Sequence, residues 1–579
     1  MPPTDAAGRS NRPADPERVG PAESAAEAQT ADADRPTLAA GGRRRQARLT
    51  SRGVELLAAL GALLLTAVVC GYWMSVARDA RYPGHADAAF AYGVAQNIHA
   101  GRGPNIDYVW HFLVPDTPLH HYAFDYWLPL PSQLMALALR SGGGLPAVLN
   151  LNIALVVLMC VGTYAMARAL SAAPWVPAVS AVVALVQPVV SSYVMQTESA
   201  VYLGAFAVPA MAAAIYARRL VLLWPVAGVL GALAAQSRTE GLVLCAVLGL
   251  AAFAWNERNR WFVRVGLLLL GYLAVSVPYL SRNFSQFGTP TPPASSSFPF
   301  ITSYENLFAP HVPHTLSNLL GSGVQEFFLS RLRGIPSVLA VAFSRLDPVT
   351  AILGLLLIGG AAFGSRRGAA TPLRSWSWAR GVLRSDWLVP AGFLVAALLS
   401  TALVAPSWSG AATIKTMVAG VPILVVAALV QLGRGVVTTR VTVVCCLALI
   451  VFPLLSVARH SRATVRHNNV VGSNVATLIK PMQAEQACLN RRLVLMTRNP
   501  WEDNQGTGFA TVMIPNGSLA EILDMALKYG ATNIENPAVR LDERTMAAAL
   551  AKGGPFVTSA AFGSRKIYRI RATTGGARC

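Results

Sequence analysis

The chain has 579 residues, of which 54% are hydrophobic and only 13% are charged, and its formal net charge is +20. Soluble domains carry about a quarter charged residues, so this composition excludes a soluble protein and predicts an integral membrane protein. The basic residues stand in short clusters between apolar runs, which is the positive-inside pattern of membrane proteins and excludes a nucleic-acid-binding face.

Residues 1–52 are rich in Ala, Pro, Gly, Asp and Arg and contain no aromatic residue. Such a segment cannot bury enough apolar surface to fold, so we expect a disordered cytoplasmic tail. The basic run Arg43–Arg48 directly precedes the first apolar segment and predicts that the N-terminus stays inside. No signal-peptide core precedes that run, so we expect the first apolar segment to be an uncleaved anchor.

Residues 53–458 are expected to form a transmembrane domain, because they contain about eleven apolar segments that approach the length of roughly 20 residues needed to span a bilayer. The predicted fold class is therefore an α-helical polytopic membrane protein. The expected spans are 54–75, 145–170, 175–193, 201–216, 220–235, 241–255, 261–280, 349–363, 387–404, 411–432 and 441–457.

The charges between these segments predict the topology. With the N-terminus inside, the links that hold Arg (218–219, 258–264, 366–384 and 434–440) all fall on the cytoplasmic side without adjustment. The same parity places the remaining polar segments outside. These are the exterior loops 76–144 and 281–348, the turns 196–198 and 236–240, and everything from 459 onward.

Residues 459–579 predict a small extracytoplasmic α/β domain. We expect strands at 492–497, 555–559 and 566–570, and helices at 518–529 and 545–551; Ser518 and Glu521 have the spacing of a capping box. Cys488 and Cys579 are the two cysteines outside the predicted spans, and they are either a disulfide or two free thiols.

The first exterior loop carries an unusual concentration of ionisable groups. Residues 81–127 hold four carboxylates and five of the nine histidines. In a membrane protein with few charges, such a cluster indicates a functional site, although a solvated connecting loop is the alternative. The aromatic residues at 108–112 and 125–127 either stack on sugar rings or anchor the loop at the membrane interface.

Asp87 is the candidate catalytic residue of this loop. Residues Ala86–His99 have the apolar spacing of an amphipathic helix on the membrane surface, with His85 and Asp87 at its N-terminus. The helix dipole keeps a carboxylate there ionised, so Asp87 could act as a general base. Its alternative role is simply to cap the helix.

Further charges stand at the exterior turns, where isolated charges are costly and usually pair or bind a ligand. Glu198 lies at the entrance of a predicted span, and Arg238 and Glu240 lie at another exterior turn. Arg238 could bind a phosphate oxygen or pair with Glu240. Lys415, near a predicted span end, is interpreted as a snorkelling side chain.

No metal site is assigned. His111, His120 and His121 stand near Asp116 and Asp125, but no compact ligand spacing is present, so a divalent metal is compatible with the sequence and not required by it. No phosphate-binding Gly-rich loop is present either, which gives no support to an ATP-driven pump.

The pattern His85-x-Asp87-x5-Gly93-x-Ala95-x2-Ile98-x2-Gly101-x-Gly103 resembles the first exterior loop of the GT-C superfamily, whose members are membrane glycosyltransferases that use polyprenyl-phosphate-linked sugars. Protein O-mannosyltransferases, aminoarabinose transferases and arabinofuranosyltransferases belong to it. Further motifs follow in the order expected of that family: Thr197-Glu198, Ser237-Arg238-Thr239-Glu240-Gly241, Asn283-x3-Phe287-Gly288-x2-Pro290, Val494–Trp501, Met513–Ser518 and Lys528-Tyr529-Gly530.

The resemblance implies that Asp87 is the catalytic aspartate of the first loop. The family often has a second acid beside it, where this chain has His85 or Ala86. Asp107, Asp125 or Glu198 could replace that acid, and Arg238 would bind the donor phosphate. We therefore list the expected substrate-binding residues as His85, Asp107, Asp125, Glu198, Arg238 and Glu240.

The resemblance further implies a hexosyl- or pentosyltransferase in the cytoplasmic membrane. It would move a sugar from a polyprenyl phosphate to a hydroxyl of a glycan, lipid or protein at the outer face, in cell-envelope assembly. Two alternatives remain open: a lipid or glycan transporter, and a non-catalytic membrane protein that binds the cell wall. The near absence of ionisable residues inside the spans disfavours the transporter.

Overall fold

The computed structural model describes residues 37–574 except 115, 256–259, 298–299, 302, 322–323, 345, 347, 349, 352–380, 382, 405–408, 435–437 and 563–564. It divides into two compact units, residues 1–54 and 55–579, and everything below concerns the second unit. The predicted disordered tail therefore falls largely on residues outside the described part of the chain.

Among the described residues, six helices are long and apolar enough to cross a membrane, and each coincides with a predicted span. They are α1 (Thr37–Ala77), α4 (Gly144–Leu170), α7 (Ser199–Ala217), α10 (Trp261–Phe287), α17 (Ser409–Gly433) and α18 (Thr439–Ala476). These helices indicate a multi-pass membrane protein.

Four other predicted spans are shorter apolar helices, namely α5 (Val176–Leu185), α8 (Leu223–Ser237), α9 (Glu240–Ala254) and α16 (Leu388–Val404). The predicted span 175–193 is divided into α5 and α6 (Pro188–Tyr193). Pro188 lacks a backbone N–H and pushes Gln187 into extended backbone, with ψ at 140°, which ends the first helix. The predicted span 349–363 lies mostly outside the described residues, so the count of about eleven is not confirmed.

The two segments predicted to be exterior loops contain longer helices that were not predicted, α3 (Leu130–Leu139) and α13 (Val324–Ser344). α13 lies in the expected exterior loop 281–348 and packs against α16 and α17. The same loop contains α11 (Pro293–Ser297), the 3₁₀ helix η2 (Tyr304–Phe308) and α12 (Leu316–Gly321).

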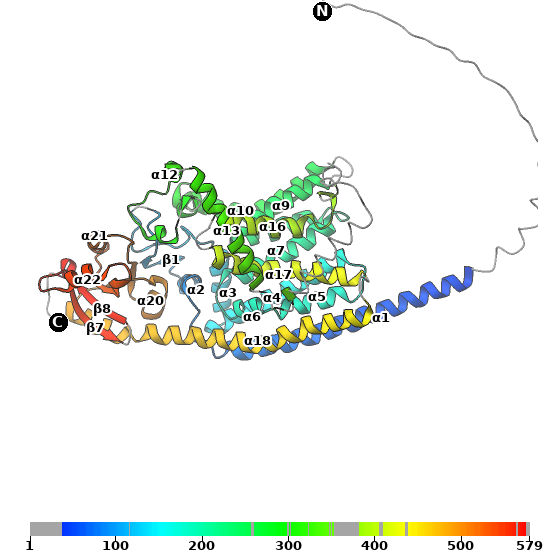
Figure 1. Ribbon diagram of the computed structural model, residues 1–579, viewed down its shortest axis with the longest axis horizontal. Helices are drawn as coiled ribbons and strands as arrows, with labels where there is room; N and C mark the ends of the chain where they lie inside the picture. Colours follow the sequence, from blue (N-terminus) through cyan, green and yellow to red (C-terminus); the bar gives the residue numbers. More distant parts are fainter. Residues whose placement is uncertain are drawn as a thin grey trace, which may run out of the picture. The chain divides into compact units, whose positions relative to one another are not determined.

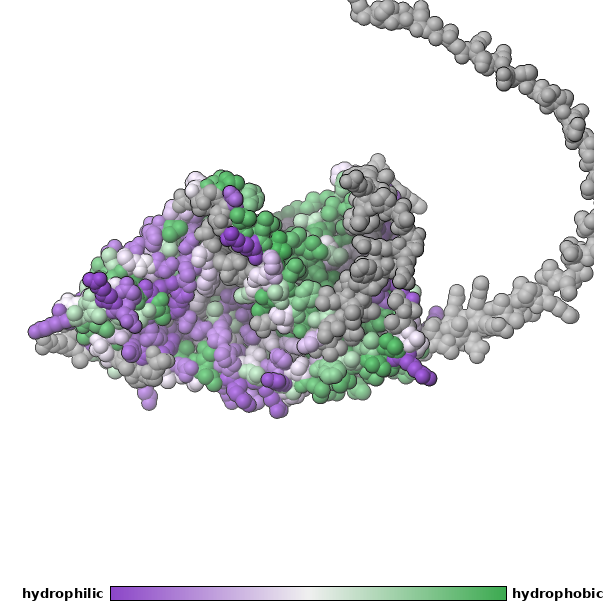
Figure 2. Space-filling view, in the orientation of Figure 1, coloured by the Kyte–Doolittle hydropathy of each residue, from purple (hydrophilic) through white to green (hydrophobic). Residues whose placement is uncertain are grey.

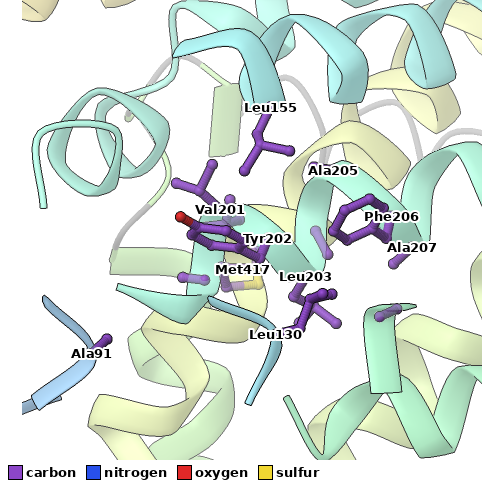
Figure 3. Packing of buried hydrophobic residues seen from close by; sticks show 14 of the residues in the cluster. Ala91, Leu130, Leu155, Val201, Tyr202, Leu203, Ala205, Phe206, Ala207 and Met417 are labelled. Atoms are coloured by element: carbon purple, nitrogen blue, oxygen red, sulfur yellow. The ribbon is translucent and has the colours of Figure 1, made fainter. Parts of the chain in front are cut away.

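The helical core is centred on α7, which packs against α4, α8 and α17. Figure 3 shows α7 side chains such as Tyr202 and Phe206 surrounded by residues of other helices, among them Leu155 of α4 and Met417 of α17. Tyr202 and Met417 are almost completely buried. This packing fixes α17 against the N-terminal half of α7.

The C-terminal part contains a six-stranded sheet with the order β2-β5-β4-β6-β8-β7. Figure 1 labels its last two strands, β7 and β8, near the C-terminus. The strands β5, β4 and β6 are parallel, and β8 runs antiparallel to β6 and β7. Their bounds are β4 (Val494–Thr497), β5 (Ala510–Met513), β6 (Asn533–Glu535), β7 (Phe556–Phe562) and β8 (Arg565–Ile570). The predicted mixed α/β character of this region is confirmed. The strands β5 and β6 were not predicted from the sequence.

The sheet also takes a strand from the first exterior loop. β2 (Tyr108–Val109) pairs in parallel with β5, with Tyr108 opposite Thr511. A second short pair, β1 (Asn105–Ile106) with β3 (His121–Tyr122), lies in the same loop. The first exterior loop and the C-terminal region therefore share one sheet.

Helices connect the strands of this region. α21 (Leu519–Tyr529) begins with the expected capping box of Ser518 and Glu521 and ends at Gly530, which has a φ of +64°. The others are α19 (Ile479–Leu489), α20 (Pro500–Thr507), η4 (Pro537–Val539), α22 (Glu543–Leu550) and α23 (Arg571–Thr574).

Hydropathy separates the two regions on the surface. In Figure 2 hydrophobic residues gather over the area of α9 and α10, whereas hydrophilic residues gather over the C-terminal sheet. The five cysteines of the predicted spans are free thiols. Cys488 is disulfide-bonded, but Cys579 lies outside the described residues, so their pairing stays a prediction.

Candidate functional site

The candidate site begins with α2, which spans Ala86–His99 as predicted. Its residues 88–92 are all buried, and it packs against α3 and α20. Protein therefore covers much of this helix, and its predicted position at the membrane surface stays a prediction. Ala86 has a φ of +31°, a conformation that strains a residue with a side chain and that is often found at functional sites.

Glu502 of α20 holds the start of this helix. One of its carboxylate oxygens, Oε1, accepts hydrogen bonds from the Ala86 N–H, at 3.2 Å, and lies 3.0 Å from Nδ1 of His85. The hydrogen bond to Glu502 raises the pKa of His85 more than burial lowers it. His85 thus anchors the N-terminus of α2, one residue before the strained Ala86. The other ring nitrogen of His85, Nε2, contacts His467 of α18.

Asp87 contacts a cation that comes from a distant helix. Nζ of Lys415, on α17, lies 2.5 Å from Oδ2 of Asp87 and 2.8 Å from Oε2 of Glu198. The Lys415 side chain is only 15% exposed and that of Glu198 only 9%. Burial raises the pKa of Asp87, but the charge and hydrogen bond of Lys415 outweigh burial, so its pKa lies below the ordinary value and it is ionised.

A second ion pair lies beside the first. Nη2 of Arg238 lies 2.8 Å from Oε1 of Glu240, and Nη1 of Arg238 donates a hydrogen bond to Ser199 at 3.1 Å. Thr416 donates a hydrogen bond to the same Glu240 oxygen at 2.8 Å. The pairing of Arg238 with Glu240, one of the two predicted alternatives, is therefore present. Arg238 also lowers the pKa of Asp87 through its charge, so the two pairs are near one another.

The packing of the helices explains this convergence. Glu198 and Ser199 stand at the N-terminus of α7, and Lys415 and Thr416 are neighbours on α17, directly before the buried Met417. Figure 3 shows Met417 close to Val201 and Tyr202 at the same end of α7. The core that buries Met417 thus places the two polar residues before it beside the start of α7.

The turn between α8 and α9 depends on Gly241. A Cβ at this position would lie 2.2 Å from the Ala234 carbonyl carbon, which is closer than any real contact. Only glycine permits this approach of the two helices, and the approach aligns Arg238 and Glu240, which flank the turn.

Aromatic rings cover the other side of Asp87. A hydrogen bond from the Trp127 side chain is among the contributions that lower the pKa of Asp87. Trp127 stacks on Trp110 at 4.2 Å between ring centroids and lies 4.1 Å from Phe90. Trp110 is buried, so its ring packs inside the protein, and both roles predicted for these rings stay predictions.

The structure does not bring all predicted site residues together. Asp107 forms an exposed cluster with His120 and Arg492, at 2.6 and 3.3 Å. Asp125 is buried, and its Oδ2 lies 3.2 Å from Nε2 of His111. Among the contacts of Asp107 and Asp125 in the described part of the chain, none involves Asp87.

The described residues contain no group of three or more His, Cys, Asp or Glu side chains arranged to hold a metal ion. Between Asp87 and Glu198, where a cation shared by two carboxylates would sit, the structure has the ammonium group of Lys415. Of the three acids named from the sequence as possible second acids, Glu198 is the one that a lysine joins to Asp87.

Sequence reasoning missed Lys415, Thr416 and Ser199. The available signal for Lys415 was a single cation at the exterior end of a predicted span, which snorkelling explains equally well. Thr416 and Ser199 carry no charge and gave no signal, because their role depends on contacts with Glu240 and Arg238 across helices.

Comparison with solved structures supports the resemblance at the level of the fold. The structure matches ArnT from Cupriavidus metallidurans bound to undecaprenyl phosphate with a TM-score of 0.52, over 88% of this chain and 97% of that chain, at 13% identity. The apo state of that protein gives a TM-score of 0.49 over 89% and 99% of the two chains, at 13% identity.

The oligosaccharyltransferase of Archaeoglobus fulgidus in its apo form gives a TM-score of 0.49, over 83% of this chain and 69% of that one, at 11% identity. No family model and no curated protein matches the sequence. The predicted resemblance to the GT-C superfamily is thus confirmed at the level of the fold, through ArnT.

Proposed function

We propose that this protein is a glycosyltransferase that moves a sugar from a polyprenyl-phosphate donor to an acceptor hydroxyl at the outer face of the cytoplasmic membrane. The observation that carries the proposal is the contact of ionised Asp87 with Lys415. It occurs in a fold shared with ArnT, whose crystal structure was determined with bound undecaprenyl phosphate. A half-buried carboxylate beside a cation provides a proton acceptor and a partner for a phosphate in one place.

In the proposed reaction the acceptor hydroxyl oxygen attacks the anomeric carbon of the sugar. The bond between that carbon and the phosphate oxygen breaks, the hydroxyl proton passes to Asp87, and the polyprenyl phosphate leaves with the bonding electrons. Attack opposite to the leaving group inverts the anomeric centre. The energy comes from the sugar–phosphate bond, which suits an exterior site without ATP.

Lys415 has two tasks in this proposal. Its ammonium group stabilises the charge that develops on the leaving phosphate, together with Arg238. Its contact with Asp87 also makes that carboxylate a weak base, since it lowers the pKa of Asp87. A donor phosphate that draws Lys415 toward itself would therefore raise the basicity of Asp87 when the acceptor needs it.

The remaining acids hold the cations in place. Glu198 binds the side of Lys415 that does not face Asp87, and Glu240 fixes Arg238 with help from Thr416. His85 supports the start of α2 through Glu502. In this proposal Asp107 and Asp125 do not touch the reacting groups.

The test is a transfer assay with membranes that contain this chain and radiolabelled polyprenyl-phosphate sugars. We expect a labelled product, and we expect none with Asp87→Asn at equal expression. The matched control is Asp116→Asn, which removes an exposed acid of the same loop bound to Lys528. Transfer by Asp87→Asn at the rate of the parent would refute the base assignment.

A parallel sample with EDTA tests metal dependence. Because Lys415 occupies the place between the two carboxylates, we expect transfer to persist in the chelator. Movement of intact donor across the membrane without a transferred sugar would instead support the transporter alternative.

A further inference from the structure

The carboxyl edge of the C-terminal sheet carries a second charged cluster. Arg498 directly follows β4, Asn516 follows β5 and Arg540 follows β6, and these three strands are parallel neighbours. In open α/β sheets, ligands bind beyond the carboxyl ends of such strands. The topology thus brings two guanidinium groups and an amide to the edge where a ligand is expected.

A carboxylate of this chain already lies between the two arginines. Nη2 and Nη1 of Arg498 donate to the two oxygens of Glu305 at 2.6 and 3.1 Å, which is a bidentate arrangement. Arg540 donates to the same carboxylate. Glu305 belongs to η2 in the predicted exterior loop, so this contact joins that loop to the sheet.

The cluster has the construction of a binding site. The side chain of Arg540 is only 5% exposed, and in the described part of the chain its Nε and Nη2 have no hydrogen-bond partner. Such buried unused donors are costly in a purely structural ion pair. The Phe308 ring lies under both guanidinium groups, at 5.3 and 5.4 Å from their carbons, and holds them in orientation.

The occupant of the cluster can leave it. The Glu305 side chain is 38% exposed, whereas the arginines that bind it are more buried, at 33% for Arg498 and 5% for Arg540. A carboxylate from solution can therefore reach the two arginines once the Glu305 side chain turns away from them, and it would find the geometry that Glu305 now satisfies.

The cluster also lies close to the candidate catalytic site. Tyr304, the neighbour of Glu305, interacts electrostatically with Asp87, with Lys415 and with Arg498. Its ring packs edge-on against Phe308 at 5.2 Å. One short helix, η2, thus links the two sites.

We propose that Arg498 and Arg540 form a subsite for a carboxylate-bearing acceptor, such as a glycan that contains a uronic acid, and that Glu305 is an internal placeholder for it. This inference rests on the proposed function, because it names the chemistry of the acceptor. In the absence of acceptor, Glu305 fills the subsite. An acidic acceptor displaces it and presents its hydroxyl toward Asp87.

The experiment measures binding, so it needs no transfer activity. Glucuronic acid is titrated into the purified full-length protein in detergent at constant ionic strength, by calorimetry. Because the placeholder reduces the fraction of competent sites, we expect Glu305→Gln to bind glucuronate about tenfold more tightly than the parent. Arg498→Met should lose this binding, and Arg498→Lys, which lacks the planar fork, should retain only part of it.

Two further ligands define the chemistry. The methyl ester of glucuronic acid has the same ring without the charge and should not bind. Inorganic phosphate should bind Glu305→Gln more weakly than glucuronate does; the reverse order would overturn the assignment to a carboxylate. Asp116→Asn is the control variant, since it removes the same charge at an exposed pair and should leave glucuronate binding unchanged.

Equal glucuronate binding by Glu305→Gln and the parent, with both proteins folded by their melting curves, would overturn the inference. That result would leave the proposed transfer reaction standing. Conversely, glucuronate binding as expected without any sugar transfer from polyprenyl phosphates would refute the proposed function and leave the subsite in place.

Discussion

The ammonium nitrogen of Lys415 lies 2.5 Å from the Asp87 carboxylate, although 328 positions separate the two residues in the sequence. This contact belongs to a cluster of three carboxylates, from Asp87, Glu198 and Glu240, and two cations, from Lys415 and Arg238. The cluster therefore lacks one positive charge when all five groups are ionised. Uptake of one proton from an acceptor hydroxyl would balance it, which is the task we propose for Asp87.

The first prediction concerns Asp87 itself. Asp87→Asn keeps the size of the side chain but cannot accept the acceptor proton, so we expect kcat for sugar transfer to fall by about 10²–10⁴-fold. The KM for the donor should change little, since the amide does not remove Lys415 or Arg238. Initial rates at several donor concentrations, normalised to the amount of protein, measure both quantities. A large rise in KM with an unchanged kcat would contradict the role of a base.

The second prediction concerns the stability that Lys415 provides. Lys415→Met leaves the buried Glu198 and the half-buried Asp87 without their shared cation. Because of the stranded charge on Glu198, we expect the unfolding free energy to drop by about 3–5 kcal/mol. The double variant Lys415→Met/Glu198→Gln removes one of the stranded charges and should recover part of the loss. Thermal melting in detergent compares the two proteins. Equal melting temperatures of the single and double variants would show that Glu198 is not held by Lys415.

Local sequence signals predicted parts of the fold closely. The bounds of α2 agree with the apolar spacing, and the capping box of Ser518 and Glu521 marks the start of α21. These features depend on residues a few positions apart, which a single sequence displays. By contrast, β5 and β6 have only four and three residues, too few for a periodic pattern, and their stability comes from neighbouring strands.

The candidate site was only partly predictable for the same reason. Asp87, Glu198 and Arg238 are charged residues in a chain with few charges, so composition drew attention to them. The ion pair of Asp87 with Lys415 requires α17 to pack against α7, and nothing in the local sequence fixes that arrangement. Asp107 carried the same local signal as Asp87, yet the fold places it in an exposed cluster.

The third prediction concerns Thr416, whose hydrogen bond to Glu240 helps that carboxylate to hold Arg238. Thr416→Val keeps the shape of the side chain but removes the hydrogen bond to Glu240, which we expect to cost about 1.5–3 kcal/mol because the acceptor is charged. If Glu240 then orients Arg238 less well, the KM for the donor should rise. The matched control is Thr163→Val on α4, whose buried hydroxyl donates to the carbonyl of Met159 in the preceding turn, as the Thr416 hydroxyl can to that of Ala412. A smaller loss of stability in Thr416→Val than in Thr163→Val would refute this support.

The last prediction is a pH dependence that arises in the C-terminal sheet. Burial raises the pKa of Asp503 from 3.8 to about 7, and the negative charge of Glu535 adds to this shift. The positive charge of Arg565 opposes it. The hydroxyl of Thr497 lies 2.5 Å from Asp503 and 2.9 Å from Glu535, but it has one proton to donate. A proton on Asp503 completes this network, because Asp503 can then donate to Thr497 while Thr497 donates to Glu535.

The sign of the effect follows from the raised pKa. Between the unfolded pKa of 3.8 and the folded pKa of about 7, the folded protein holds a proton that the unfolded chain has lost. The stabilisation is thus complete below that window and is lost as the pH rises through it, by at most about 1.4 kcal/mol per pH unit. Asp503→Asn, whose amide can donate to Thr497 at any pH, should have a flatter profile of melting temperature against pH. The control Asp107→Asn alters an exposed acid and should retain the slope of the parent; a slope that survives in Asp503→Asn would assign the titration to another group.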